Sequence, residues 1–113
     1  MHELGLCGEI VDTLVSLKEE QKLNQITSVT LRLGEETAVV PRYMVECWPA
    51  VIEDSPLQGC KLKIEIVKAT GRCHECDCIF PLKENHLKCP KCGCEDFDTV
   101  TGFEYEISEI LVK

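Results

Sequence analysis

Apolar positions along the chain change their spacing several times, and each change predicts a different element. Residues 4–22 and 41–53 carry apolar side chains at a helical period, which favours two helices that each bury one face. Residues 26–33 and 61–68 instead alternate apolar and polar side chains, as half-buried strands do. A further alternating stretch follows Gly102, so the predicted order is helix, strand, helix, strand, a cysteine-rich segment and a last strand.

These patterns predict an α+β fold, a two-layer domain with two helices on a small mixed sheet. The cysteine-rich segment should then be an insertion between two neighbouring sheet strands. The side chains expected to face the core are Leu4, Cys7, Ile10, Val11, Leu14, Val15 and Leu17 in the first helix, Val29, Leu31 and Leu33 in the first strand, Met44, Val45, Trp48, Val51 and Ile52 in the second helix, and Leu62, Ile64 and Ile66 in the next strand. In the first strand, Ser28, Thr30 and Arg32 should point the other way.

Two Cys-x-x-Cys pairs, Cys73/Cys76 and Cys89/Cys92, stand twelve residues apart in the cysteine-rich segment. Two such knuckles supply four thiolates at tetrahedral corners, the arrangement of a structural zinc ribbon. The residue after each knuckle often needs a positive φ; Gly93 adopts one freely and Asp77 tolerates it. Few large apolar side chains accompany the cysteines, so we expect a metal ion to hold this segment in shape.

Alternatives to a four-cysteine zinc site come from the neighbouring residues and from redox chemistry. Cys78, Cys94, His74 and His86 are further candidate ligands, and iron of the rubredoxin type also uses two such knuckles. Disulfides are disfavoured because the cysteine count of nine is odd and no hydrophobic secretory leader precedes the first helical pattern. We therefore expect a reducing, cytoplasmic environment.

Composition narrows the classes of partner. The 113 residues carry a net charge of −8, whereas phosphate binding needs a basic face, so nucleic acid is not expected as a partner. No apolar run is long enough to span a membrane, so membrane association is not expected either.

The first three residues, Met1, His2 and Glu3, run directly into the first helical pattern. A free terminal amine, the next backbone nitrogens and one imidazole can surround a metal in a plane, which favours Ni(II) or Cu(II) over zinc. The first amides of a helix have no intrahelical acceptor, so binding metal through them would break no helical hydrogen bond. Binding would release protons and should therefore weaken as the pH falls.

The combined pattern resembles the hydrogenase maturation factor family HypA/HybF over essentially the full length. It comprises Met1-His2-Glu3-Leu4, the turn Leu33-Gly34-Glu35, the strand at residues 61–67, the two cysteine pairs with Cys89-Pro90 and Cys92-Gly93, and the closing Gly102-x-Glu104. The two knuckles alone occur in many zinc ribbons. Their combination with an N-terminal Met-His-Glu at this separation is specific.

The resemblance implies a nickel-binding α/β domain at residues 1–70 plus 102–113 and a zinc-ribbon domain at residues 71–101. Carried over by position, transient Ni(II) binds at Met1, His2 and Glu3, and structural Zn(II) binds at Cys73, Cys76, Cys89 and Cys92. It also implies a nickel metallochaperone, not an enzyme, that delivers the metal to the large subunit of [NiFe]-hydrogenase with a partner GTPase. Some members also serve urease through its accessory proteins, and whether the chain is a homodimer is left open.

One position departs from the family pattern. The family usually carries an acidic residue just before the second helix, where this sequence has Val40. Glu35 and Glu36 are the candidates to replace it as a nickel ligand.

The cysteine-rich segment also leaves three alternative functions. A zinc-ribbon adaptor in a larger assembly would need no nickel, and a rubredoxin-like redox protein would bind iron at the four thiolates. Hydrolase chemistry is the least supported, because the histidines at positions 2, 74 and 86 do not have the i, i+4 spacing of a helical zinc-protease motif.

Overall fold

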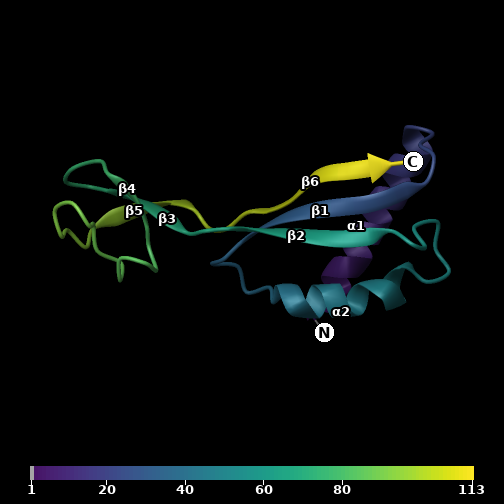
Figure 1. Ribbon diagram of the computed structural model, residues 1–113, viewed down its shortest axis with the longest axis horizontal. Coiled ribbons are helices and arrows are strands. Elements are labelled where there is room, and N and C mark those ends of the chain that lie inside the picture. The colour runs from purple at the N-terminus through teal and green to yellow at the C-terminus, as the bar shows by residue number, and fades with distance from the viewer. Residues whose placement is uncertain (1) are drawn as a thin grey trace. The chain divides into compact units, whose positions relative to one another are not determined.

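The computed structural model describes residues 2–113, the side chain of His2 excepted. Its elements follow the predicted order, with three short strands within and around the cysteine-rich segment that the sequence patterns did not reveal (Figure 1). The elements are α1 (His2–Glu20), β1 (Ile26–Gly34), α2 (Pro41–Ile52), β2 (Lys61–Val67), β3 (Thr70–Cys73), β4 (Ile79–Pro81), β5 (Phe97–Thr101) and β6 (Tyr105–Val112).

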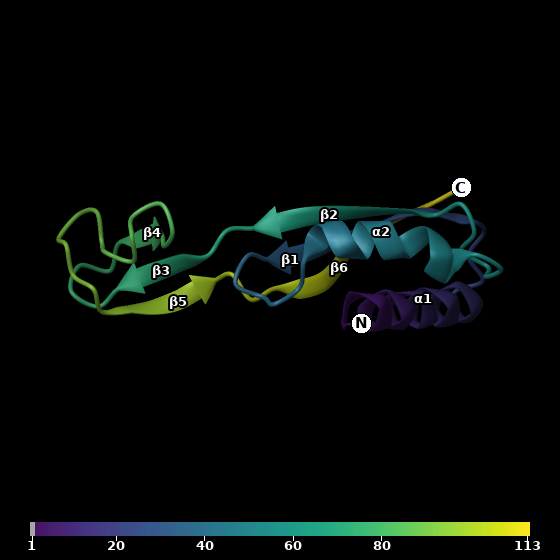
Figure 2. The same ribbon diagram turned by 90° about the horizontal axis from the view of Figure 1, so that it is seen from below.

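The strands of residues 2–113 form two three-stranded sheets, in the orders β2-β1-β6 and β4-β3-β5. The first sheet is mixed. β1 and β2 run in the same direction (Figure 2). β1 and β6 are antiparallel. At one end of this pair Lys113 N–H donates to Gln25 O (2.8 Å), and at the other end Gly34 N–H donates to Glu104 O (2.8 Å). The α+β class with two helices and a mixed sheet is confirmed.

The strands that flank the cysteine-rich segment are not neighbours in the sheet, so that expectation was wrong. β1 lies between β2 and β6, and the segment therefore joins the two edge strands. Burial explains the order: β1 is largely buried along its length, whereas β6 is almost entirely exposed. The strand that buries most apolar surface takes the centre of the sheet.

The chain divides into two compact units. The first comprises the residues up to Leu31, Ala38–Glu65 and Glu106–Lys113, and the second comprises Arg32–Thr37 and Ile66–Tyr105. The functional division at residues 70/71 and 101/102 stays a prediction.

In the first unit, α1 and α2 pack against one face of the sheet (Figures 1 and 2). The buried side chains come from both helices, β1 and the loop before β2: Cys7, Ile10, Val11, Leu14, Ile26, Val29, Leu31, Met44, Trp48, Ile52, Leu57 and Cys60. The indole N–H of Trp48 donates to Cys60 O at 2.8 Å, which satisfies its polar atom inside the core.

Three predicted core residues are exposed instead, and one predicted surface residue is buried. Leu4, Val45 and Ile66 are 46%, 48% and 48% exposed. Val45 lies beside the stripe of α2 that is buried, which consists of Met44, Trp48 and Ile52. Ser28 is buried because the inward face of β1 shifts by one residue between Ile26 and Val29, which both contact the core. Simple alternation fails at such a shift.

Neither helix of residues 2–113 combines the length and the apolar character that crossing a bilayer requires.

A side chain from α1 completes the start of α2. Val40, the N-cap of α2, has no side-chain cap of its own, and its backbone N–H donates to Glu3 Oε2 at 3.2 Å. In a capping box a Glu within the same helix makes this bond; here the carboxylate comes from another helix. A negative charge at a helix N-terminus is also favourable, so Glu3 fixes the first turn of α1 against the start of α2.

The loop after β1 holds both connections to the second sheet. Gly34 N–H donates to Glu104 O, Glu35 N–H to Val67 O (2.9 Å) and Glu36 N–H to Gly102 O (2.8 Å). The Glu35 carboxylate accepts the N–H of Ala69 at 2.7 Å. The backbones approach so closely that a Cβ on Gly34 would lie 2.1 Å from Gly102 O.

Gly34→Ala is therefore expected to destabilise the zinc-loaded protein by about 3 kcal/mol or more, since rigid backbone would have to move. Gly8→Ala is the matched control: nothing lies within 4 Å of its Cβ position, and removing a helical glycine should stabilise by roughly 0.5–1 kcal/mol. Urea unfolding followed through the amide signals of β1 measures both changes, and an unaltered midpoint for Gly34→Ala would contradict the close crossing.

Candidate metal centre

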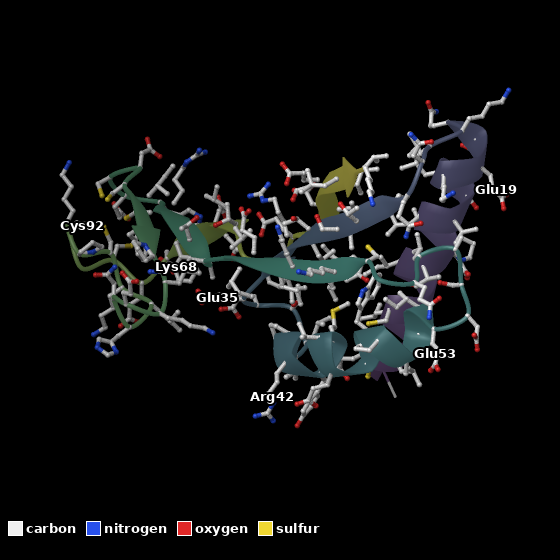
Figure 3. The ribbon with its side chains drawn as sticks, turned by 45° about the vertical axis from the view of Figure 1, so that its right-hand side comes forward. Glu19, Glu35, Arg42, Glu53, Lys68 and Cys92 are labelled. Atoms are coloured by element: carbon white, nitrogen blue, oxygen red, sulfur yellow. The ribbon has the colours of Figure 1, made fainter. Side chains whose placement is uncertain are left out.

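Four cysteines converge from two turns of the second unit. Cys73 ends β3 and Cys76 follows it in the turn before β4, whereas Cys89 and Cys92 lie in the loop between β4 and β5. In Figure 3, Cys92 lies at the end of this unit that is away from Lys68 and Glu35. β3 pairs antiparallel with both β4 and β5, and this sheet positions the two turns.

The two turns have the same backbone structure. Asp77 N–H donates to Cys73 O (3.0 Å), and Gly93 N–H makes the equivalent bond to Cys89 O (2.8 Å). Asp77 and Gly93 both have a positive φ, at 59° and 77°, which confirms the prediction for the residue after each knuckle. The backbone N–H of Cys73 donates to the carbonyl five residues on at 2.9 Å, and that of Cys89 does the same.

The ligand atoms of these four cysteines lie within 4.8 Å of one another. Across the knuckles, Cys73 Sγ is 3.4 Å from Cys92 Sγ, and Cys76 Sγ is 3.5 Å from Cys89 Sγ. Among the described residues this is the one group of three or more Cys, His, Asp or Glu side chains that could hold a metal. Four converging sulfurs suit tetrahedral Zn²⁺, and they leave no coordination position for a substrate.

Backbone amides favour a thiolate at the first cysteine of each knuckle. The N–H of Cys76, followed by that of Glu75, lowers the pKa of Cys73. At Cys89 burial raises the pKa, but the amides two and three residues on outweigh it and bring the value to about 6. Amides that point at sulfur stabilise its charged form.

The pKa of the second cysteine of each knuckle is raised. At Cys92 the amide of Cys94 acts to lower the pKa, but the thiol of Cys73 and burial raise it to about 12. At Cys76 the amide of Cys78 acts to lower the pKa, but burial, followed by the thiols of Cys89 and Cys73, raises it. Four thiols this close cannot all ionise unless a cation lies between them, so metal binding must displace protons.

Little apolar surface supports this centre. Phe80 packs edge-to-face on Phe97, with ring centroids 5.9 Å apart, and Ala69 and Leu82 complete the buried cluster with the cysteines. The other large apolar side chains of the segment, Ile79, Leu87 and Val100, are about half exposed, at 54%, 53% and 44%.

The remaining candidate ligands have other roles. Cys78 and Cys94 occupy equivalent places, each two residues after its knuckle, and both pack at the edge of the apolar cluster. His74 Nε2 lies 2.9 Å from Asp98 Oδ1, and the hydrogen bond with this carboxylate raises the pKa of His74. His86 is exposed in a turn with a φ of 54°.

The candidate nickel residues are only partly described. Met1 and the side chain of His2 lie outside the described residues, so their assignment stays a prediction. Glu3 is 8% exposed and its carboxylate holds Val40 N–H, a role that sequence patterns missed, although an acidic residue in a first helical turn was a signal for it. Glu35 is bonded to Ala69 within the second unit, and Lys83 Nζ lies 4.0 Å from its other oxygen.

The cysteines of the first unit are packing residues. Cys7 is fully buried, its thiol donates to Met44 O (3.4 Å), and burial raises its pKa to about 11. Cys60 is buried and Cys47 packs at the rim of the same core. A protonated, buried thiol such as that of Cys7 is inert, and the helical pattern had placed Cys7 in the core.

Comparison with known proteins identifies the family to which the chain is similar. Residues 1–112 match a family model described as "Hydrogenase/urease nickel incorporation, metallochaperone, hypA". A hydrogenase maturation factor HypA from Geotalea uraniireducens is 32% identical over 113 residues, which cover all of both chains. One from Dehalococcoides mccartyi is also 32% identical, over 99% of this chain and 94% of the relative.

Two solution structures share the fold. A HypA protein aligns with a TM-score of 0.74 at 19% identity, over 100% of this chain and 97% of the other. The nickel metallochaperone HypA from Helicobacter pylori aligns with a TM-score of 0.58 at 21% identity, over 93% and 95%. The family model, the full-length relatives and the four-cysteine centre agree, and the chain belongs to the HypA family of nickel-incorporation metallochaperones.

Proposed function

We propose that this chain is a carrier that binds Ni(II) at its N-terminus and delivers it in the cytoplasm to the large subunit of [NiFe]-hydrogenase, together with a maturation GTPase. The family description names nickel incorporation, and the curated relatives are named as hydrogenase maturation factors. The same description names urease, so urease accessory proteins are the alternative partners. The carrier role requires no chemical step, so we assign no catalytic residue.

The observation that carries the nickel site is the start of α1 at His2. The first backbone N–H groups of a helix have no intrahelical acceptor, so those of His2 and Glu3 are available to a metal without loss of a helical bond. The backbone nitrogens of His2 and Glu3, the Met1 amine and the His2 imidazole together make four nitrogen ligands. Four nitrogens in a plane match Ni(II) and leave it accessible from both sides, as transfer to a client requires.

The buried carboxylate of Glu3 supports this site from within the first unit. Its bond to Val40 N–H holds the first turn of α1 in place beside α2. Val40 itself supplies no ligand, the Glu35 carboxylate is bonded elsewhere, and Glu36 belongs to the second unit. We infer that nickel binds here through nitrogen alone, which favours release over permanent storage.

Zinc at the four cysteines is assigned a structural role. The closed sulfur set leaves no open coordination position, and the apolar cluster around it is small. Structural zinc contributes about 10–16 kcal/mol in small domains.

His2→Ala should weaken Ni(II) binding by at least about 100-fold, because it removes the imidazole ligand. Isothermal titration of tagless, zinc-loaded protein measures the affinity. His86→Ala is the matched control, since it removes an exposed imidazole from the second unit and should change nothing. Equal nickel affinity in the wild type and His2→Ala would remove the proposed site.

Adding one glycine before Met1 should also abolish tight nickel binding, because it moves the amine and inserts a further peptide into the chelate. One glycine added after Lys113 should have no effect. Under the alternative, a zinc-ribbon adaptor that handles no nickel, both extensions would be harmless.

Removing zinc with a chelator should collapse the amide spectrum of the second unit while the helical circular dichroism persists, since α1 and α2 both lie in the first unit. Cys92→Ser should lose zinc, whereas Cys94→Ser, two residues away in the same turn, should retain it. Zinc loss from both variants, or loss of the helical signal on chelation, would contradict this assignment.

A further inference from the structure

Two free thiols lie at the contact between α1 and α2 and belong to neither proposed metal site. Cys7 on α1 is fully buried, whereas Cys47 on α2 is partly exposed. Both pack in the same core cluster, and the two helices lie side by side against the sheet (Figure 2). Paired thiols in one interface can be joined by oxidation, a chemistry that apolar packing does not require.

Two hydrogen bonds between the helices set their alignment. Glu3 Oε2 accepts the N–H of Val40 at 3.2 Å. One turn further along, the thiol of Cys7 donates to Met44 O at 3.4 Å. Each bond joins residues 37 positions apart, so α1 and α2 advance in the same direction, turn beside turn. The sulfur of Cys7 therefore lies against the backbone of α2.

Cys47 lies on the part of α2 that Cys7 touches. It follows Met44 by three residues, and residues at this spacing share a helix face. Every Cα–Cβ bond of a helix tilts toward the N-terminus, so the thiol of Cys47 leans back toward the Met44 carbonyl. After burial, Cys47 is the group that most raises the pKa of Cys7, ahead of Glu3 on the same helix. The two sulfurs therefore share one small region of the interface.

The third thiol of the first unit is not part of this pair. Cys60 lies in the loop before β2, and its Sγ is directed to Lys61 O at 3.8 Å. Burial raises the pKa of Cys60, whereas at Cys7 a neighbouring thiol adds to the effect of burial. Oxidation of the interface should therefore join Cys7 to Cys47 and leave Cys60 free.

We propose that Cys7 and Cys47 are a redox-sensitive pair that forms a disulfide under oxidising conditions and ties α1 to α2. Hydrogen peroxide oxidises the accessible thiol of Cys47 to a sulfenic acid, as the O–O bond breaks and one water leaves. The sulfur of Cys7 then attacks that of Cys47, the S–O bond breaks, and the proton of Cys7 leaves with the hydroxyl as a second water. Because Cys7 is closed to reagents in solution, the oxidised sulfur of Cys47 is the electrophile that it meets. Cellular thiols reverse the reaction by exchange.

The disulfide restrains the start of α1. The pair lies one turn beyond the Glu3–Val40 bond, and it closes the chain between residues 7 and 47. A cross-link over a loop of this length limits the unfolded chain more than the folded one, so oxidation should lower the unfolding equilibrium constant at least about tenfold. The pair is independent of the nickel proposal, since neither thiol is a proposed ligand.

Mild oxidation of the full zinc-loaded chain with hydrogen peroxide tests the pair, at a dose that leaves the zinc content unchanged. After alkylation of free thiols in denaturant, trypsin should release the peptide of residues 1–18 linked to that of residues 43–61, and reduction should separate them. Mass spectrometry with fragmentation identifies the cysteine that carries the link. Urea unfolding of the oxidised and reduced protein measures the stabilisation.

Cys47→Ser should abolish the linked peptide. Cys60→Ser is the matched control, because it removes the other cysteine of residues 43–61 and should leave the link in place. Cys47→Ala repeats the test without a new hydroxyl at the rim of the core. Unchanged helical circular dichroism and zinc content establish that each variant is folded.

A link through Cys60, a link that persists in Cys47→Ser, or zinc release before any link forms would overturn the proposal. A disulfide between two chains, seen as a dimer on a non-reducing gel, would do the same. So would oxidation of Cys47 to a sulfinic acid while Cys7 stays free, or equal urea midpoints for the oxidised and reduced protein.

Discussion

Four sulfur atoms within 4.8 Å of one another are the constraint on which the second unit depends. The backbone amides of each knuckle lower the pKa of its first cysteine, while crowding raises that of its second. Only a cation can stabilise all four as thiolates. Three short strands and two aromatic rings could not order these loops on their own. The stability of the unit therefore depends on metal binding at the centre.

The first unit is held together by apolar packing instead. Its core is conventional, with two helices over one face of a mixed sheet. Its unusual feature is a buried carboxylate at Glu3 that caps α2 instead of its own helix.

Close backbone approach explains why two positions of the second unit, Gly34 and Gly102, are glycines. The loop after β1 donates three backbone hydrogen bonds to the two connections, and Gly34 and Gly102 allow the contact. Glu35 and Glu104 satisfy further amides at this junction, those of Ala69 and Gly102. The N–H of Gly102, followed by that of Glu104 itself, lowers the pKa of the Glu104 carboxyl. The carboxylates of Glu35 and Glu104 therefore accept backbone N–H groups, although composition alone would assign both residues to a solvated surface.

By itself the sequence determined what depends on neighbours along the chain: the periods of both helices and the two clearest strands, the paired knuckles, and the positive φ at Asp77 and Gly93. These are local, because a knuckle or an amphipathic turn is specified within a few residues. Only the tertiary structure decided that β1 takes the centre of the sheet, that Leu4, Val45 and Ile66 stay exposed, and that Glu3 bonds Val40. Burial and long-range hydrogen bonds depend on which surfaces meet, and residues far apart in sequence bring those surfaces together.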